Sequence, residues 1–220
     1  MKKPICCHMH TRHTKSQRKT AIDLLGERGI MRSSELRASK IHCQTLARMV
    51  KDGKILRAGR GLYELPEADY SLNHSFAEIA KAVPKGVICL ISALQFHELT
   101  LQLPPHAWVA IGRKEWMPRI RYPSFRAIRF GEKAMSVGIE HHVIDKVETP
   151  IFDPAKTIVD CFRYRKKIGI DVALEGLRNG IRERKAHPDK IVTYAQDLRI
   201  WSVLKPYLDA TLAEISSEHT

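Results

Sequence analysis

The feature that most constrains this chain is a succession of short helical segments within its first 53 residues. Apolar spacing over residues 14–25, closed by a glycine, predicts a first amphipathic helix. Two serines at 33–34 are suited to cap a second helix over 35–38, and a four-residue turn over 39–42 follows. A third helix is expected from Cys43 to Asp52 with Gly53 as its stop. Helices separated by a tight turn predict a helix-turn-helix.

The segment after Gly53 predicts a basic β-hairpin. Residues 54–58 and 62–65 have strand composition, and Gly59-Arg60-Gly61 forms a tight tip between them. A hairpin directly after a recognition helix is a wing, which lays arginine against the DNA backbone or in the minor groove. We therefore expect a winged helix-turn-helix over residues 16–66.

A helical wheel separates the third helix into two faces. Leu46, Met49 and Val50 fall on one side, opposite Gln44, Arg48 and Lys51. Gln can pair with adenine, Arg with guanine and Lys with phosphate. In an isolated helix, the same residues would be interpreted as a charged face exposed to solvent. The basic wing that follows this helix favours the DNA-binding interpretation. The expected contacts lie on this helix, the turn before it and the wing: Gln44, Thr45, Arg48, Lys51, Arg57, Arg60 and Lys40.

The charge distribution supports a polyanion-binding N-terminal region. Residues 1–65 contain 15 Lys and Arg against 5 Asp and Glu, a net charge of +10, out of +13 for the chain. The remaining 155 residues contain 22 against 19, a net charge of +3. Such asymmetry indicates a nucleic-acid-binding module joined to a nearly neutral domain.

The first 15 residues are expected to form a flexible basic arm that adds phosphate attraction. A metal site is the alternative, because thiolate and imidazole side chains occur here: Cys6, Cys7, His8, His10 and His13. Against it, the two cysteines are adjacent and no second cluster completes a tetrahedral site. We expect no metal and no cofactor, and a metal-responsive regulator is kept as a lesser hypothesis.

The sequence of residues 67–220 predicts a larger mixed α/β domain that ends in helices. A helix is expected over 75–82, strands over 87–91, 108–111, 125–130 and 139–144, a helix over 93–99 capped by Ser92, and helices after Asp153 and over 171–183, 188–198 and 201–215. Strands followed by helices indicate an α+β class.

No catalytic motif accompanies these elements. The region has no phosphate-binding glycine loop, no paired zinc ligands and no nucleophile elbow. His97, His141 and His142 are the acid–base candidates, but histidines beside apolar strands are more often structural. We expect no enzyme. A nuclease delivered to DNA by the basic domain is the enzymatic alternative.

The chain is expected to be cytoplasmic. No apolar run has the length of a membrane span, and no apolar stretch follows the basic start, as a secretory signal would require. The 5 scattered cysteines are most simply reduced thiols.

The sequence resembles the AbiEi-type antitoxins of type IV toxin–antitoxin systems. In the N-terminal region the resemblance lies in Leu-Ala-Arg-Met-Val-Lys-Asp-Gly-Lys-Ile-Leu-Arg at 46–57 and Gly-Leu-Tyr-Glu-Leu at 61–65. Further on it lies in Gly86-Val87-Ile88 with Ser92-Ala93-Leu94, Asp-Pro-Ala-Lys-Thr-Ile-Val-Asp at 153–160, residues 172–177 and residues 204–208. Their order and spacing carry the resemblance across almost the whole chain beyond the arm.

The resemblance implies an N-terminal winged helix that represses its own operon by binding repeats upstream. It also implies a C-terminal antitoxin domain, residues 67–220, that counteracts a nucleotidyltransferase-like toxin encoded beside it. An orphan transcriptional regulator without such a neighbour is the alternative.

Overall fold

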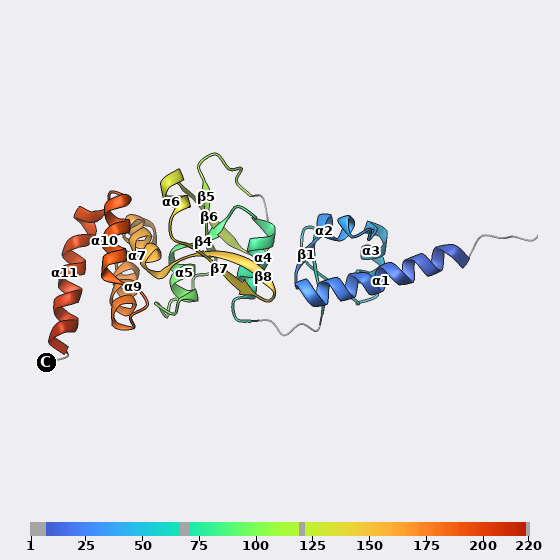
Figure 1. Cartoon of the computed structure of the whole chain (residues 1–220), viewed down its shortest axis with the longest axis horizontal. Helices are drawn as coiled ribbons and strands as arrows, with labels where there is room; N and C mark the ends of the chain where they lie inside the picture. The colour runs from blue at the N-terminus through green and yellow to red at the C-terminus, as the bar shows by residue number, and fades with distance from the viewer. Residues whose placement is uncertain (1–7, 67–70, 119–121, 219–220) are drawn as a thin grey trace, which may run out of the picture. The chain divides into compact units, whose positions relative to one another are not determined.

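The computed structural model describes residues 8–66, 71–118 and 122–218, which form two compact units. The first extends to Pro84 and includes the segment Val143–Glu148. The second consists of Lys85–His142 and the chain from Thr149 onward. Figure 1 labels most of their helices and strands.

The first unit combines helices with a small antiparallel sheet. Its elements are α1 (His8–Arg28), β1 (Met31–Arg32), α2 (Ser33–Ala38), α3 (Cys43–Lys51), β2 (Leu56–Gly59), β3 (Leu62–Glu64) and α4 (His74–Ala82). The strand order is β1-β3-β2, with Met31 opposite Tyr63 and Leu56 opposite Glu64. The helix-turn-helix and its wing are therefore present with the order that the sequence predicts.

The core of this unit joins the three N-terminal helices to the wing. Its fully buried apolar side chains are Ala21, Leu25, Met31, Leu36, Ile41, Leu46, Met49 and Ile55. Removal of this apolar surface from water is the main favourable term in the folding of the motif.

Three details of the N-terminal prediction are wrong. Helix α1 begins at His8, so residues 8–15 are helical and not part of a flexible arm; residues 1–7 lie outside the described residues. The second helix is capped by Arg32 and Glu35, whose carboxylate accepts from the Arg32 amide at 2.6 Å, and not by a serine. The sequence does not predict strand β1, since two residues carry no periodic signal.

The boundary between the compact units also differs from the expected one at residue 66. Helix α4 groups with the first unit. The Arg32 guanidinium donates to the Lys81 carbonyl of α4, and the Lys81 ammonium lies 2.9 Å from the Glu35 carboxylate. Polar contacts of α4 with α2 therefore extend the first unit beyond the winged helix.

The second unit contains a mixed five-stranded sheet and most of the helices. Its elements are β4 (Val87–Ile88), α5 (Leu90–Phe96), β5 (Ala107–Gly112), β6 (Phe125–Phe130), α6 (Glu132–Ser136), β7 (Ile139–Ile144), β8 (Val147–Phe152), α7 (Pro154–Arg163), α8 (Arg165–Ile168), α9 (Ile170–Arg182), α10 (Pro188–Asp197) and α11 (Trp201–Glu218). The strand order is β6-β5-β4-β8-β7, in which β5 runs parallel to β6 and β4 parallel to β8.

The α+β class is confirmed, with three local corrections. Strand β4 has only two residues, and α5 begins at Leu90, so Ser92 lies inside the helix instead of capping it. The buried Ser92 hydroxyl accepts from the Trp108 amide at 2.9 Å and ties α5 to β5. Strand β8 is absent from the sequence-based prediction.

Helix α7 is the most buried helix of this unit. Asp153 caps it by accepting from the Lys156 amide at 2.7 Å, and Pro154 occupies its first turn, as predicted. Lys156 and Asp160, one turn apart on α7, form an ion pair in which neither side chain is exposed. Across the three described ranges, no helix combines the length and the apolar character that crossing a membrane requires.

Candidate nucleic-acid interface

A rigid turn sets the direction of α3. Lys40 adopts φ +61°, and the turn ends at Ile41, whose amide donates to the Leu36 carbonyl at 3.1 Å. Ile41 itself is buried in the core. The turn is thus fixed by backbone bonds and by an apolar anchor, while Lys40 stays exposed.

Helix α3 presents the polar face that the sequence predicts. Leu46 and Met49 are fully buried, whereas Gln44, Arg48 and Lys51 are exposed. Gln44 and Arg48 lie four residues apart and therefore on one face, one turn from each other. The first turn of α3 has no acidic side chain, so the positive end of the helix dipole is not neutralised there. This arrangement suits a polyanion.

Thr45 does not belong to this face, and its burial argues against its prediction as a DNA contact. Thr45 is only 4% exposed, and its hydroxyl donates to Gln17 Oε1 of α1 at 2.9 Å. The polar face of the wheel centres on Gln44 and Arg48, and Thr45 lies about 100° from Gln44, toward the core. Thr45 therefore helps to hold α3 against α1.

A second contact between α1 and α3 lies at the other end of α3. Arg18 of α1 lies 3.0 Å from the carboxylate of Asp52, which is the C-cap residue of α3. Both side chains are about two-fifths exposed, so the pair contributes little to stability. Its effect is electrostatic, because Arg18 offsets the negative charge of Asp52, the residue that follows Lys51 in the sequence.

The wing is attached to the start of α2. Gly61 adopts φ +73°, and its carbonyl accepts from the Ser33 amide at 2.7 Å. A Cβ at Gly61 would lie 3.2 Å from the Ser33 hydroxyl, so both the backbone angle and the space favour glycine. Arg60 at the tip is exposed, whereas Arg57 donates from Nε to the Gly59 carbonyl at 3.3 Å. Arg60 is the more available of the two arginines.

The contacts between α2 and α4 surround a carboxylate of low pKa. Burial would raise the pKa of Glu35, but hydrogen bonds from the Arg32 amide and from Lys81 outweigh it and lower the pKa. Glu35 is thus held as an anion that bridges α2 to α4.

Two of the three candidate histidines of the second unit, His97 and His142, have structural partners. His97 Nε2 lies 2.8 Å from the Phe152 carbonyl, and burial lowers its pKa. His142 lies 3.2 Å from Glu140, and its ring packs against Phe96. These contacts favour the structural interpretation over acid–base chemistry. Cys6 and Cys7 lie outside the described residues, so the N-terminal metal hypothesis stays a prediction.

Comparisons with known proteins agree with the winged helix. Residues 20–66 match the family model described as "Transcriptional regulator, AbiEi antitoxin", which confirms the resemblance over the helix-turn-helix and wing. The description of this family model is that of a transcriptional regulator. No curated protein sequence matches the chain.

A solved structure has a similar fold over most of the chain. The crystal structure of the RV2827C protein from Mycobacterium tuberculosis has a TM-score of 0.57 at 10% sequence identity. The similarity covers 89% of this chain and 77% of that protein. At this identity the likeness concerns the fold alone.

Proposed function

We propose that this protein is a sequence-specific DNA-binding autorepressor and the antitoxin of a type IV toxin–antitoxin system. In this proposal the winged helix binds double-stranded operator repeats upstream of its own operon. Residues 67–220 counteract a nucleotidyltransferase-like toxin encoded in the same operon. The protein acts in the cytoplasm and has no catalytic role.

The observation that carries the proposal is the exposed polar face of α3. A helix whose apolar side is fully buried presents Gln44 and Arg48 one turn apart, with Lys51 following on the same side. Gln and Arg side chains are those that form bidentate bonds to adenine and guanine in the major groove. The folding of α3 does not require Gln44 and Arg48 at these exposed positions, because its packing depends on the buried apolar side.

The surroundings of α3 supply the contacts that DNA phosphates need. Lys40 lies in the preceding turn and Arg60 at the tip of the wing, both exposed. Arg57 adds charge at the base of the wing. These residues position the duplex, and the net charge of +10 over residues 1–65 attracts it at longer range.

The proposal is tested with the full-length chain and DNA from upstream of its own gene. Fluorescence anisotropy at several salt concentrations compares this DNA with a scrambled duplex. We expect at least a thousandfold preference at physiological salt, as is typical of specific binding, and a steep loss of affinity with added salt. Equal affinity for both duplexes would overturn the repressor assignment.

A second measurement separates the antitoxin from an orphan regulator and from a nuclease. Co-expression of the chain with a nucleotidyltransferase encoded beside it should restore growth, and this rescue should survive loss of DNA binding. Without such a neighbour, the orphan alternative would hold. Incubation of operator DNA with the chain and Mn²⁺ should leave the DNA intact, whereas cleavage would favour the nuclease.

A further inference from the structure

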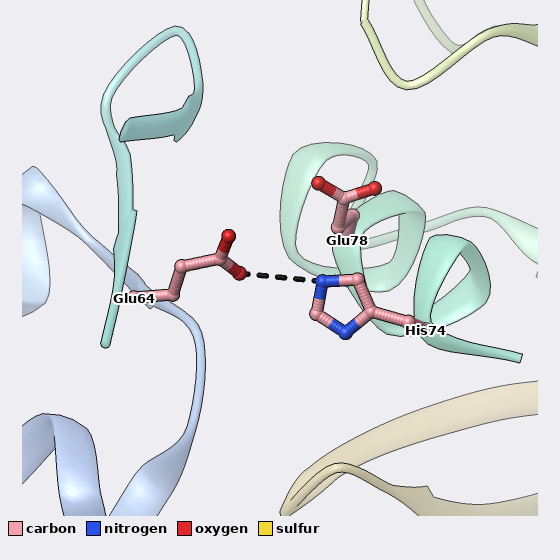
Figure 2. Close-up of side chains that lie close together, drawn as sticks. All are labelled: Glu64, His74 and Glu78. Carbon is pink, nitrogen blue, oxygen red and sulfur yellow. Dashed lines mark ion pairs between the residues drawn. The ribbon is translucent and has the colours of Figure 1, made fainter. Parts of the chain in front are cut away.

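Three side chains of the first unit meet at one point that no sequence motif indicates. Figure 2 shows Glu64 from the end of β3 facing His74 and Glu78, which lie on α4. The ligand-type atoms of all three, one per residue, lie within 4.8 Å of one another. His74 and Glu78 are four residues apart and so occupy the same face of α4.

The imidazole of His74 is oriented by a carboxylate on its other side. Its Nδ1 lies 2.8 Å from the Asp145 carboxylate, and its Nε2 lies 3.3 Å from Glu64 Oε2. A hydrogen bond from Nδ1 to a carboxylate fixes the ring and directs Nε2 as a ligand, which is the usual support of metal-binding histidines. The Nε2 atom thus faces the carboxylates of the group.

Glu64 brings a buried acceptor that the protein does not satisfy by hydrogen bonding. The residue is 8% exposed, and Oε2 lacks a hydrogen-bond partner within the described part of the chain. Glu78 is 2% exposed. Burial raises the pKa of Glu78 to about 7; the charge of His74 opposes the rise and that of Glu64 adds to it. Two buried carboxylates so close together repel each other unless a proton or a cation lies between them.

We propose that Glu64, His74 and Glu78 bind a divalent transition-metal ion, with Asp145 as the residue that orients His74. One imidazole nitrogen and two carboxylate oxygens are a donor set suited to Zn²⁺, Mn²⁺ or Co²⁺. Two ligands of one tetrahedral Zn²⁺ lie about 3.4 Å apart. Glu64 and His74 already have about this separation, and a carboxylate oxygen of Glu78 lies within 4.8 Å of both.

One side of the site borders a cleft. Glu64 and His74 line a cleft of about 680 Å³ in the first unit, and Asp145 borders it as well. Lys146 also lines this cleft, but its ammonium donates to the Gly26 carbonyl. Three protein ligands leave at least one coordination position for water.

The bound ion would join the last strand of the wing to α4. This inference concerns metal binding alone and does not depend on the proposed DNA or toxin activity. Binding to the folded chain stabilises it against unfolding by mass action. The chain should therefore be more stable with the ion than after chelation.

The test is equilibrium dialysis of the chelator-treated full-length chain against Zn²⁺ alone and against Co²⁺ alone. We expect one saturable site in addition to any ion held by the N-terminal cysteines. A Cys6→Ser/Cys7→Ser variant removes that second source and should keep the proposed site. In this variant Co²⁺ should give visible d–d bands without a thiolate-to-cobalt charge-transfer band.

Single substitutions in the same Cys6→Ser/Cys7→Ser background locate the ion. Glu78→Gln and His74→Gln should each abolish saturable binding, and Asp145→Asn should weaken it by about 10–100-fold. Asp189→Asn is the matched control, because this exposed carboxylate also lies beside a histidine, His187. It should bind normally.

Circular dichroism in the presence of EDTA separates the removal of a ligand from a failure to fold. Glu78→Gln keeps the side-chain shape and removes a buried charge, so the metal-free variant should be folded. The proposal is overturned if the Cys6→Ser/Cys7→Ser variant binds no ion, or if folded Glu78→Gln binds as tightly as its parent.

Discussion

The Thr45 hydroxyl of α3 lies 2.9 Å from Gln17 Oε1 of α1, and both residues are buried. The His42 amide at the N-cap of α3 lies 3.4 Å from the same oxygen. A single amide oxygen of α1 thus receives two donors from the start of α3. This contact helps to hold α3 against α1 from its buried side.

Thr45→Val should therefore destabilise the protein without changing its choice of DNA. Valine has the shape of threonine but leaves Gln17 Oε1 with only the long bond from His42. The expected decrease is about 1–2 kcal/mol in the free energy of unfolding, which urea denaturation measures. A variant of unchanged stability that no longer distinguished operator from scrambled DNA would return Thr45 to the set of base contacts.

Gln44→Ala and Arg48→Ala should reduce discrimination between DNA sequences. Each removes a side chain that the proposed function assigns to the groove floor. Each should therefore cost about 1–3 kcal/mol in operator binding, with relaxed preference at particular base pairs. Anisotropy against a set of single-base operator variants measures this. If both variants kept full discrimination, α3 would not be the recognition helix.

The cationic residues around α3 should behave differently. Replacement of Lys40, Lys51 or Arg60 by Ala should weaken binding to all duplexes evenly and reduce the salt slope by about 1 for each phosphate that is no longer neutralised. Arg57→Ala should have a smaller effect, because its Nε is bonded to Gly59. Leu46→Ala is the control for unfolding, with an expected destabilisation of about 2–5 kcal/mol from a fully buried site. A salt slope that is the same in every variant would contradict the phosphate assignment.

The sequence predicts the parts of this fold in which periodicity and local stop signals agree. Helix α3 ends within one residue of its predicted end, and α7 has its predicted cap and first-turn proline. The predicted cap of α2 is wrong. Serine is a common N-cap residue, so Ser33 and Ser34 attracted the prediction, but the N-cap is Arg32, whose amide donates to Glu35 at the third position of the helix. Strand β1 forms because it pairs with β3. This contact is not local in the sequence, and a segment of two residues is too short to show a strand pattern.

The sites differ in how far the sequence can predict them. The exposed face of α3 lies within one helix, so a wheel finds Gln44 and Arg48. The group of Glu64, His74 and Glu78 joins a strand to a helix, and only the spacing of His74 and Glu78 is local. A His and a Glu four residues apart occur on many solvated helices. Only the fold brings Glu64 to them.

The pair of Lys156 and Asp160 leads to a prediction on stability. Both side chains are fully buried, and the Lys156 ammonium lies 4.1 Å from the ring centroid of Phe152. Asp160→Leu alone leaves the Lys156 charge buried without its partner, and should cost about 3–5 kcal/mol. The double variant Lys156→Met/Asp160→Leu should recover most of this stability, because apolar replacement of a whole buried pair is often neutral. Urea unfolding of the wild type, both single variants and the double variant measures the coupling. Effects that simply add would show that the two charges do not interact.

Asp160 should also make the stability depend on pH in an unusual direction. Burial raises the pKa of Asp160 to about 6, above the ordinary 3.8, and the charge of Lys156 only partly opposes this rise. The folded chain then binds the proton of this carboxyl more tightly than the unfolded chain does. Its contribution to stability is therefore greatest below about pH 4 and is lost as the pH rises through about 6.

Comparison with Asp160→Asn isolates this contribution, because asparagine does not titrate and the other ionisable groups are common to both proteins. The free energy of unfolding of the wild type relative to Asp160→Asn should fall by roughly 3 kcal/mol at most between pH 4 and pH 6 and stay constant above pH 7. Urea denaturation at each pH gives the difference. A wild-type advantage that grows with pH would mean that attraction to Lys156 exceeds the cost of burying the carboxylate, since the pKa of Asp160 would then lie below its ordinary value.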